Sequence, residues 1–383
     1  MAYFVLLWTS VKHGKGGVRG FSPVSCVNRA RGYSAAVAEL DATVADHHVA
    51  LLHPKDLMNG TIPYPKSLSP SAVMEFKKCP QSYLFQYLWG LKQPTNEALA
   101  KGSMCHSALE KVFDLDPSTR SLENLQNLFR SSWAEHRTDD TYRPLFEDAE
   151  TKEWDVQAER EWGLSGLKLL ENYYKIEDPR QVPRPNPVQR EVWVVSKLSI
   201  DPSQGVTHPH QTDKEQKPED IPSFLVRGIV DRLDMVRVKR HVALRIVDYK
   251  TGKAPNLKYS QRMNEQIADE AFYQLKIYAL LLREKAAEKL NGMDLRWLRL
   301  LHLTSHSGEA KYLDMDLGPT QEERDRVLQE VHADLSQIWT DIHALVATQD
   351  PKAFVGCDRS FCYCHSCRDK FLEGTIWQPK KAP

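Results

Sequence analysis

The sequence lacks an excess of charge of either sign, a long hydrophobic run and an internal repeat. Its 383 residues include 51 Lys and Arg and 51 Asp and Glu, so the formal net charge is zero. Because the overall charge does not indicate a polyanionic partner, any basic surface must be local. No apolar run is long enough to span a bilayer, and we expect no membrane partner. The length fits one large domain or two smaller ones.

Cysteine is scarce except in one short segment near the C-terminus. Four of the seven cysteines follow the spacing C-x4-C-x-C-x2-C there: Cys357, Cys362, Cys364 and Cys367. This is not the pattern of a small secreted domain held by disulfides, and it indicates zinc or iron–sulfur ligation. Cys79, which precedes Pro80 on the first expected long helix, is a candidate distant ligand. Reduced thiols in a flexible tail are the alternative.

The first 38 residues contain no acidic residue. Five basic residues precede Glu39: Lys12, Lys15, Arg19, Arg29 and Arg31. The apolar core of a secretory signal is absent, and a basic leader of this kind resembles an organelle transit peptide. We therefore expect residues 1–60 to be a disordered targeting leader for a mitochondrion or a plastid. The alternative is an unprocessed extension or a poorly chosen start site, with the protein in the nucleus or cytoplasm.

Helical periodicity begins near Leu68. Ser69 and Pro70 predict a helix start, with Ser69 as the N-cap and Pro70 in the first turn. One amphipathic run is expected to continue from there to Gly90. Further helices are expected over 103–113, within 121–136 and within 152–175.

The period then changes to that of strands. Four strands are expected, at 191–195, 224–236, 242–249 and 295–303. Residues 201–222 are polar without periodicity and are expected to form a disordered insertion. Long helices are expected at 265–290 and 322–347, followed by a cysteine-rich tail at 355–369. This order predicts an α/β fold in which helices cover a mixed sheet.

Two apolar runs each deliver a carboxylate. One is Gly228-Ile229-Val230-Asp231, and the other is Ile246-Val247-Asp248-Tyr249-Lys250. Because side chains at i and i+2 of a strand share a face, Asp248 and Lys250 should project into one pocket, which Asp231 reaches from the neighbouring strand. Two acids and an amine suit a hard divalent cation that activates water beside a phosphate. An ordinary hairpin edge with solvated charges is the alternative, and the apolar character of both runs weighs against it.

Three other residues are weak candidates when each is taken alone. His106 stands near a helix start and could give a nitrogen ligand, although a lone helical histidine is usually a packed or surface residue. Gln274 and Tyr278 are four residues apart on an expected helix and therefore share one face. By themselves they look like ordinary helix residues.

Taken together, these segments resemble the RecB-type nuclease family of the PD-(D/E)XK superfamily, particularly bacterial RecB-family exonuclease-like proteins. The resemblance covers nearly everything after residue 66. The matching segments, in order, are Ser67-Leu68-Ser69-Pro70-Ser71, Cys79-Pro80, Gly102-x-x-x-His106-x-x-Leu109-Glu110, Arg190-Glu191-Val192-Trp193, Arg227-Gly228-Ile229-Val230-Asp231-Arg232-Leu233-Asp234, Val247-Asp248-Tyr249-Lys250-Thr251-Gly252 and Gln274-x-x-x-Tyr278.

The resemblance implies a restriction-endonuclease-like domain over residues 66–375, with a mixed four-stranded sheet flanked by helices. The ligands that it implies for Mg²⁺ or Mn²⁺ are His106, Asp231, Asp248 and the backbone carbonyl of Tyr249. The catalytic set that it implies is Lys250, Asp248, Asp231, Gln274 and Tyr278.

Many such relatives hold a [4Fe–4S] cluster with one cysteine before the nuclease core and three after it. Cys79 matches the first cysteine, but the tail departs from the usual C-x2-C-x5-C spacing. The expected ligands are Cys79, Cys362, Cys364 and Cys367, with Cys357 as an alternative member. Zinc is the alternative metal.

We therefore expect a metal-dependent DNA nuclease of repair or replication that acts on single-stranded ends. The positive surface should lie near the site, at Arg232, Lys253, Lys258 and Arg296. The second hypothesis is an inactive DNA-binding module within a larger repair complex, against which the intact acid–acid–lysine set argues. A third makes the tail a zinc-bound interaction knuckle. Since no Walker A loop is present, any helicase motor is expected to be a separate chain.

Overall fold

The computed structural model describes the greater part of one unit of the chain, residues 62–383. The described residues are 62–91, 93–181, 187, 189–200, 206–207, 222–238, 241–289, 293–365 and 367. The expected leader at 1–60 lies outside them, as does most of the expected insertion at 201–222. Two residues of that insertion, Val206 and Thr207, pair with the strand before it.

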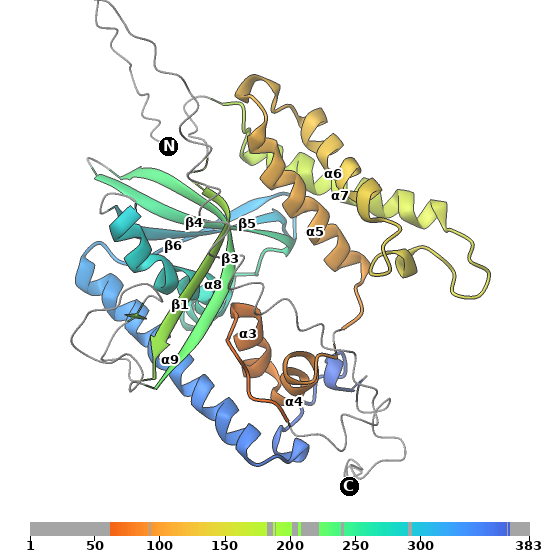
Figure 1. Ribbon diagram of the computed structural model, residues 1–383. Coiled ribbons are helices and arrows are strands. Elements are labelled where there is room, and N and C mark those ends of the chain that lie inside the picture. Colours follow the sequence, from red (N-terminus) through yellow and green to blue (C-terminus); the bar gives the residue numbers. More distant parts are fainter. Residues whose placement is uncertain are drawn as a thin grey trace, which may run out of the picture. The chain divides into compact units, whose positions relative to one another are not determined.

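Six strands form one mixed sheet in the order β2-β1-β3-β4-β5-β6 (Figure 1). Their bounds are Gln189–Ser199 (β1), Val206–Thr207 (β2), Ser223–Val238 (β3), His241–Lys253 (β4), Asp294–Thr304 (β5) and Lys311–Asp316 (β6). All neighbouring pairs are antiparallel except β4 and β5, which run parallel. The predicted α/β fold with a mixed sheet is confirmed, but the predicted number of four strands is wrong. The strands missed are the two edges, which are short, and β6 has no buried residue that could give a period.

Helices cover both faces of this sheet. Their bounds are Pro70–Lys78 (α3), Pro80–Tyr83 (α4), Leu84–Leu88 (η2, a π-helix), Glu97–Lys111 (α5), Leu122–His136 (α6), Val156–Ile176 (α7), Gln261–Lys289 (α8) and Gln321–Ala347 (α9). Single 3-10 turns lie at Val112–Asp114, Pro117–Thr119, Arg143–Leu145 and Pro351–Ala353. None of these helices is both long and apolar enough to cross a bilayer.

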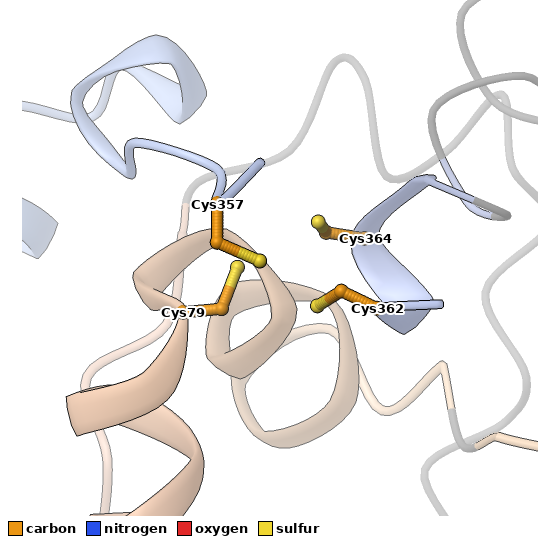
Figure 2. A group of neighbouring side chains, drawn as sticks. All are labelled: Cys79, Cys357, Cys362 and Cys364. Carbon is orange, nitrogen blue, oxygen red and sulfur yellow. The ribbon is translucent and has the colours of Figure 1, made fainter. Parts of the chain in front are cut away.

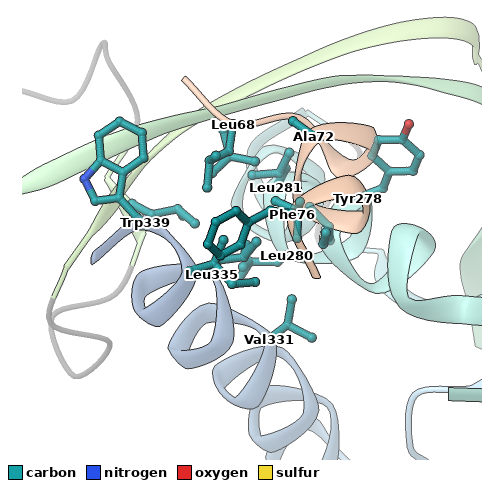
Figure 3. Close-up of a cluster of buried hydrophobic side chains, with 14 of the residues drawn as sticks. Leu68, Ala72, Phe76, Tyr278, Leu280, Leu281, Val331, Leu335 and Trp339 are labelled. Carbon is teal, nitrogen blue, oxygen red and sulfur yellow. The ribbon is translucent and has the colours of Figure 1, made fainter. Parts of the chain in front are cut away.

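The alternation of strand side chains explains the two helical layers. On β4, Leu244 and Ile246 point into a core shared with α3, α8 and α9, whereas Val247 and Tyr249 point into a second core shared with α5, α6 and α7. Figure 3 shows part of the first core, where side chains of α3, α8 and α9 meet beneath the sheet.

The first predicted helix is interrupted. Ser69 caps α3 as predicted, since its Oγ accepts a hydrogen bond from the N–H of Ala72 at 3.2 Å. The single run expected up to Gly90 is wrong, because the helix ends at Lys78 and Cys79 is extended. Pro80 then starts α4, since proline is disfavoured inside a helix but suited to its first turn. Cys79 therefore stands at a corner of the chain rather than on a helix face.

Candidate active site

The two predicted carboxylates meet where β3 and β4 separate. The last ladder pair of these strands joins Arg232 to Val247, and Asp231 and Asp248 are the next residues on each strand. Beyond this point β4 continues beside β5 and β3 continues beside β1. The fork between the two strands therefore brings the acids together, as the sequence predicted.

Asp248 is buried, with only 3% of its surface exposed. Its Oδ2 forms an ion pair with Nζ of Lys250 at 2.6 Å, but the angles of this contact are not those of a hydrogen bond. Burial raises the pKa of Asp248 to about 6, and Asp231 adds to the rise while Lys250 opposes it. A buried carboxylate oxygen without a hydrogen bond is suited to bind a cation.

Asp231 connects the fork to helix α5. Its Oδ2 accepts a hydrogen bond from the backbone N–H of Tyr249 at 2.9 Å and lies 3.3 Å from Nδ1 of His106. Burial lowers the pKa of His106, but the hydrogen bond and charge of Asp231 outweigh it, so the net pKa is raised. The structure thus places His106 beside Asp231, although its isolated sequence context favoured an ordinary helical histidine.

Lys250 is held by two residues of α8. Its Nζ donates to Oε1 of Gln274 at 3.0 Å, and Nε2 of Gln274 donates to the hydroxyl of Tyr278 at 3.0 Å. Burial raises the pKa of Tyr278 to about 12, so the phenol keeps its proton at neutral pH. The three residues form a chain of hydrogen bonds that fixes the ammonium beside Asp248.

Tyr249 has its side chain on the other face of β4, against the edge of the His106 ring. Its hydroxyl accepts a hydrogen bond from Nη1 of Arg232 at 2.8 Å. The N–H, not the carbonyl, contacts Asp231. The carbonyl as a metal ligand stays a prediction.

Glu191 is a site residue that the sequence analysis did not select. It lies on β1 opposite Asp231, between the ladder pairs on either side, and has a φ of 45°, which is rare for a non-glycine residue. Its carboxylate and ligand atoms of His106 and Asp231 all lie within 4.8 Å of one another. Burial, and then Asp231, raise its pKa to about 7. The available signal was an acid directly before the apolar run of β1.

The donor set suits a hard divalent ion. Ligand atoms of Glu191, Asp231 and His106 lie within 4.8 Å of one another, and Asp248 lies outside this group but near enough for its charge to act on His106 and Glu191. Magnesium and manganese prefer such oxygen-rich sites. Burial is the main cause of the raised pKa values of Glu191 and Asp248, and repulsion from the charge of Asp231 raises both further. A cation between them would relieve this repulsion, so the residues fit the ion that the resemblance implies.

Two of the expected surface cations are used elsewhere. Arg232 is 5% exposed and binds the carboxylates of Glu177 and Asp234, so its assignment to a DNA-binding surface is wrong. Arg296 forms a bidentate pair with Asp316. A strand position next to the site does not guarantee exposure, because the guanidinium of Arg232 on β3 lies against the rings of Phe113 and Tyr249.

A second group of possible ligands lies at the corner formed by Cys79. The sulfurs of Cys79, Cys357, Cys362 and Cys364 all lie within 4.8 Å of one another (Figure 2). The group includes Cys357, the alternative member, while Cys367 is buried and outside it. Although burial raises it, hydrogen bonds from Arg359 bring the pKa of Cys357 down to about 6. Four clustered sulfurs, one of them a thiolate at neutral pH, fit zinc or an iron–sulfur cluster.

Comparison with protein families agrees with this geometry. A model of the PD-(D/E)XK nuclease superfamily matches residues 67–369, which include both the fork and the four clustered cysteines. No curated protein matches the sequence significantly.

Proposed function

Because the chain belongs to the PD-(D/E)XK nuclease superfamily, we propose that it is a metal-dependent DNA nuclease that degrades single strands from their ends during repair or replication. The observation that carries this proposal is the meeting of Asp231, Asp248 and Lys250 at one fork of the sheet. A separate helicase or repair protein would supply the ends, since the chain has no Walker A loop.

Each residue of the fork has a role in this reaction. Asp231, Asp248 and His106 would hold Mg²⁺ or Mn²⁺, with Glu191 beside them. When bound, the ion would neutralise charge on the scissile phosphate and lower the pKa of the attacking water. Lys250 orients that water and stabilises the negative charge that develops on the phosphate. Gln274 keeps the Lys250 ammonium in place.

The test compares end-labelled linear and circular single strands, with duplex DNA, in Mg²⁺, in Mn²⁺ and with chelator. We expect metal-dependent products from linear single strands only. Asp248→Ala and Lys250→Ala should each lower the rate at least about 100-fold while leaving DNA binding largely intact. Lys311→Ala, on the edge strand β6, is the matched control and should cleave normally. Undiminished digestion by both site variants would refute the assignment.

We propose that the second metal site is a [4Fe–4S] cluster or zinc held by Cys79, Cys357, Cys362 and Cys364. Its role is structural, because it would join the corner after α3 to the chain beyond α9, where Arg359 already donates to the carbonyl of Lys78 at 2.6 Å. Measuring iron, sulfide and zinc in anaerobically purified protein distinguishes a [4Fe–4S] cluster from a zinc ion. Metal-free protein of full stability and activity would contradict the proposal.

A further inference from the structure

The second helical layer covers only part of its face of the sheet. In the described part of the chain, the core beneath α5, α6 and α7 takes its strand residues from β4, β5 and β6, with none from β1 or β3. The opposite face of β1 and β3 packs on α3, α8 and α9 through Val194 and Val226, among others. On the outer face of β1 and β3, α5 reaches the end of the strands at Arg190 and Asp231. In the part of the chain that the structure describes, none of residues 193–197 and 225–229 belongs to the core beneath α5, α6 and α7.

Six side chains form this surface, which we call the β1–β3 face. They are three cross-strand pairs of the antiparallel ladder: Trp193 with Ile229, Val195 with Arg227, and Lys197 with Leu225. Because side chains alternate along a strand, all six lie on the face opposite the buried core. Trp193 is 46% exposed and Val195 is 40% exposed. The surface therefore combines an exposed indole with two cations.

The same row of positions ends in the proposed active site. One step further along both strands, Glu191 and Asp231 lie between the ladder pairs Arg190–Arg232 and Val192–Val230. Asp231 is on the side of the sheet that α5 approaches, since it lies 3.3 Å from Nδ1 of His106. Each step of two residues advances about 6.8 Å, so Arg227 lies about 14 Å from Asp231 along β3. A chain laid along the β1–β3 face would thus reach the carboxylates directly.

We propose that the β1–β3 face binds the single strand of nucleic acid that leads into the active site. The inference rests on the proposed nuclease function and names the surface that selects its substrate. A base stacks on Trp193, while Arg227 and Lys197 contact successive phosphates. A duplex lacks the free base face that stacking on Trp193 needs, whereas a single strand offers one at every nucleotide.

Fluorescence anisotropy of labelled oligothymidylate in chelator tests this without cleavage. Trp193→Ala should weaken binding about tenfold, and Trp193→Phe, which keeps a stacking ring, should retain most of it. Arg227→Ala should lower the slope of log affinity against log salt by about 0.7, the value for one lost phosphate contact. The matched control is Tyr64→Ala, which removes an equally exposed aromatic ring in contact with His343 of α9 and should bind normally.

The other outcomes are distinguishable. If wild-type protein cleaves single strands but Trp193→Ala and Arg227→Ala bind them normally, the β1–β3 face is not the binding surface and the nuclease proposal stands. If wild-type protein neither binds nor cleaves DNA, both fail. If Trp193→Ala weakened the binding of a hairpin duplex as much as that of oligothymidylate, a single strand would be the wrong choice of substrate. Loss of a wild-type dimer in light scattering by Trp193→Ala, with DNA binding unchanged, would assign the face to a second copy instead.

Discussion

Replacing Gly228 by alanine should disturb the candidate active site by displacing Tyr278, which lies next to the glycine. Gly228 lies on β3, paired with Val194, on the face that packs against α8. A Cβ atom at this position would lie 2.6 Å from Cε1 of Tyr278 and 3.3 Å from Cδ of Pro70. Real Cβ atoms do not approach a ring carbon so closely, so Tyr278 must move. Pro70 limits adjustment on the other side.

The size of the effect follows from what Tyr278 holds. Tyr278 is 5% exposed, and overpacking a buried position costs about 1–3 kcal/mol. We therefore expect Gly228→Ala to lower the free energy of unfolding by about 2 kcal/mol. The Tyr278 hydroxyl also fixes Gln274, which fixes Lys250. Since a displacement of about 1 Å in a catalytic group can cost 100-fold in rate, activity should fall further than stability.

Urea unfolding and single-strand cleavage measure the two effects. Gly163→Ala in α7 is the matched control, because nothing lies within 4 Å of a Cβ there, and it should be neutral or slightly stabilising. Adding Tyr278→Ala should remove the clash, so the double variant should be less destabilised than the sum of the two single changes. If Gly228→Ala were as stable and as active as the Gly163→Ala control, the packing argument would be wrong.

Three further changes test separate parts of the molecule. Asp234→Asn breaks a buried pair with Arg232: burial raises the pKa of Asp234 but the charge of Arg232 lowers it further, so the carboxylate stabilises the fold above about pH 4. Urea unfolding at pH 7 should show a loss of about 3–5 kcal/mol that shrinks as the pH falls through the lowered pKa; a loss independent of pH would contradict this. Glu191→Gln should weaken Mn²⁺ binding about tenfold in calorimetry, and unchanged affinity would remove Glu191 from the ligands. Cys357→Ser should release the bound metal while Cys367→Ser retains it, and the reverse would restore the set expected from sequence.

Much of the fold could be predicted because its central elements are long and periodic. The strands β3, β4 and β5 are long and rich in apolar residues, and α9 begins with a capping box formed by Thr320 and Glu323. The edge strands gave no such signal. The break between α3 and α4 at Cys79 was also missed, because the apolar stripe continues across it and only Pro80 marks it in the sequence.

The proximity of the acids and the lysine was predictable, because spacing along a strand fixes which side chains share a face. Asp248 and Lys250 needed only this rule. His106 and Gln274 needed a resemblance, because nothing local tells which helix face meets the fork. The sequence marked Glu191 only by its place before the apolar run of β1. Its approach to Asp231 involves a positive φ, which no residue pattern of a strand predicts.

The site depends on strand register more than on any single contact. Glu191, Asp231 and Asp248 come from three adjacent strands, and a slip of one residue would turn a carboxylate to the opposite face. Arg232 opposes such a slip. It is the residue next to Asp231, it is buried, and its guanidinium binds the carboxylates of Glu177 and Asp234 as well as the hydroxyl of Tyr249.

A slipped β3 would leave this guanidinium buried without partners, which costs several kcal/mol. The apolar residues of the strands impose no such penalty on a register shift that keeps apolar residues in the core, because one apolar side chain can replace another of similar size there. The ion pairs of Arg232 therefore specify the alignment that brings Glu191, Asp231 and Asp248 to the fork. Arg232→Met, with its charge removed, should accordingly impair Mn²⁺ binding although Arg232 contacts no ligand, and normal Mn²⁺ affinity in a folded Arg232→Met variant would show that the register is fixed by other contacts.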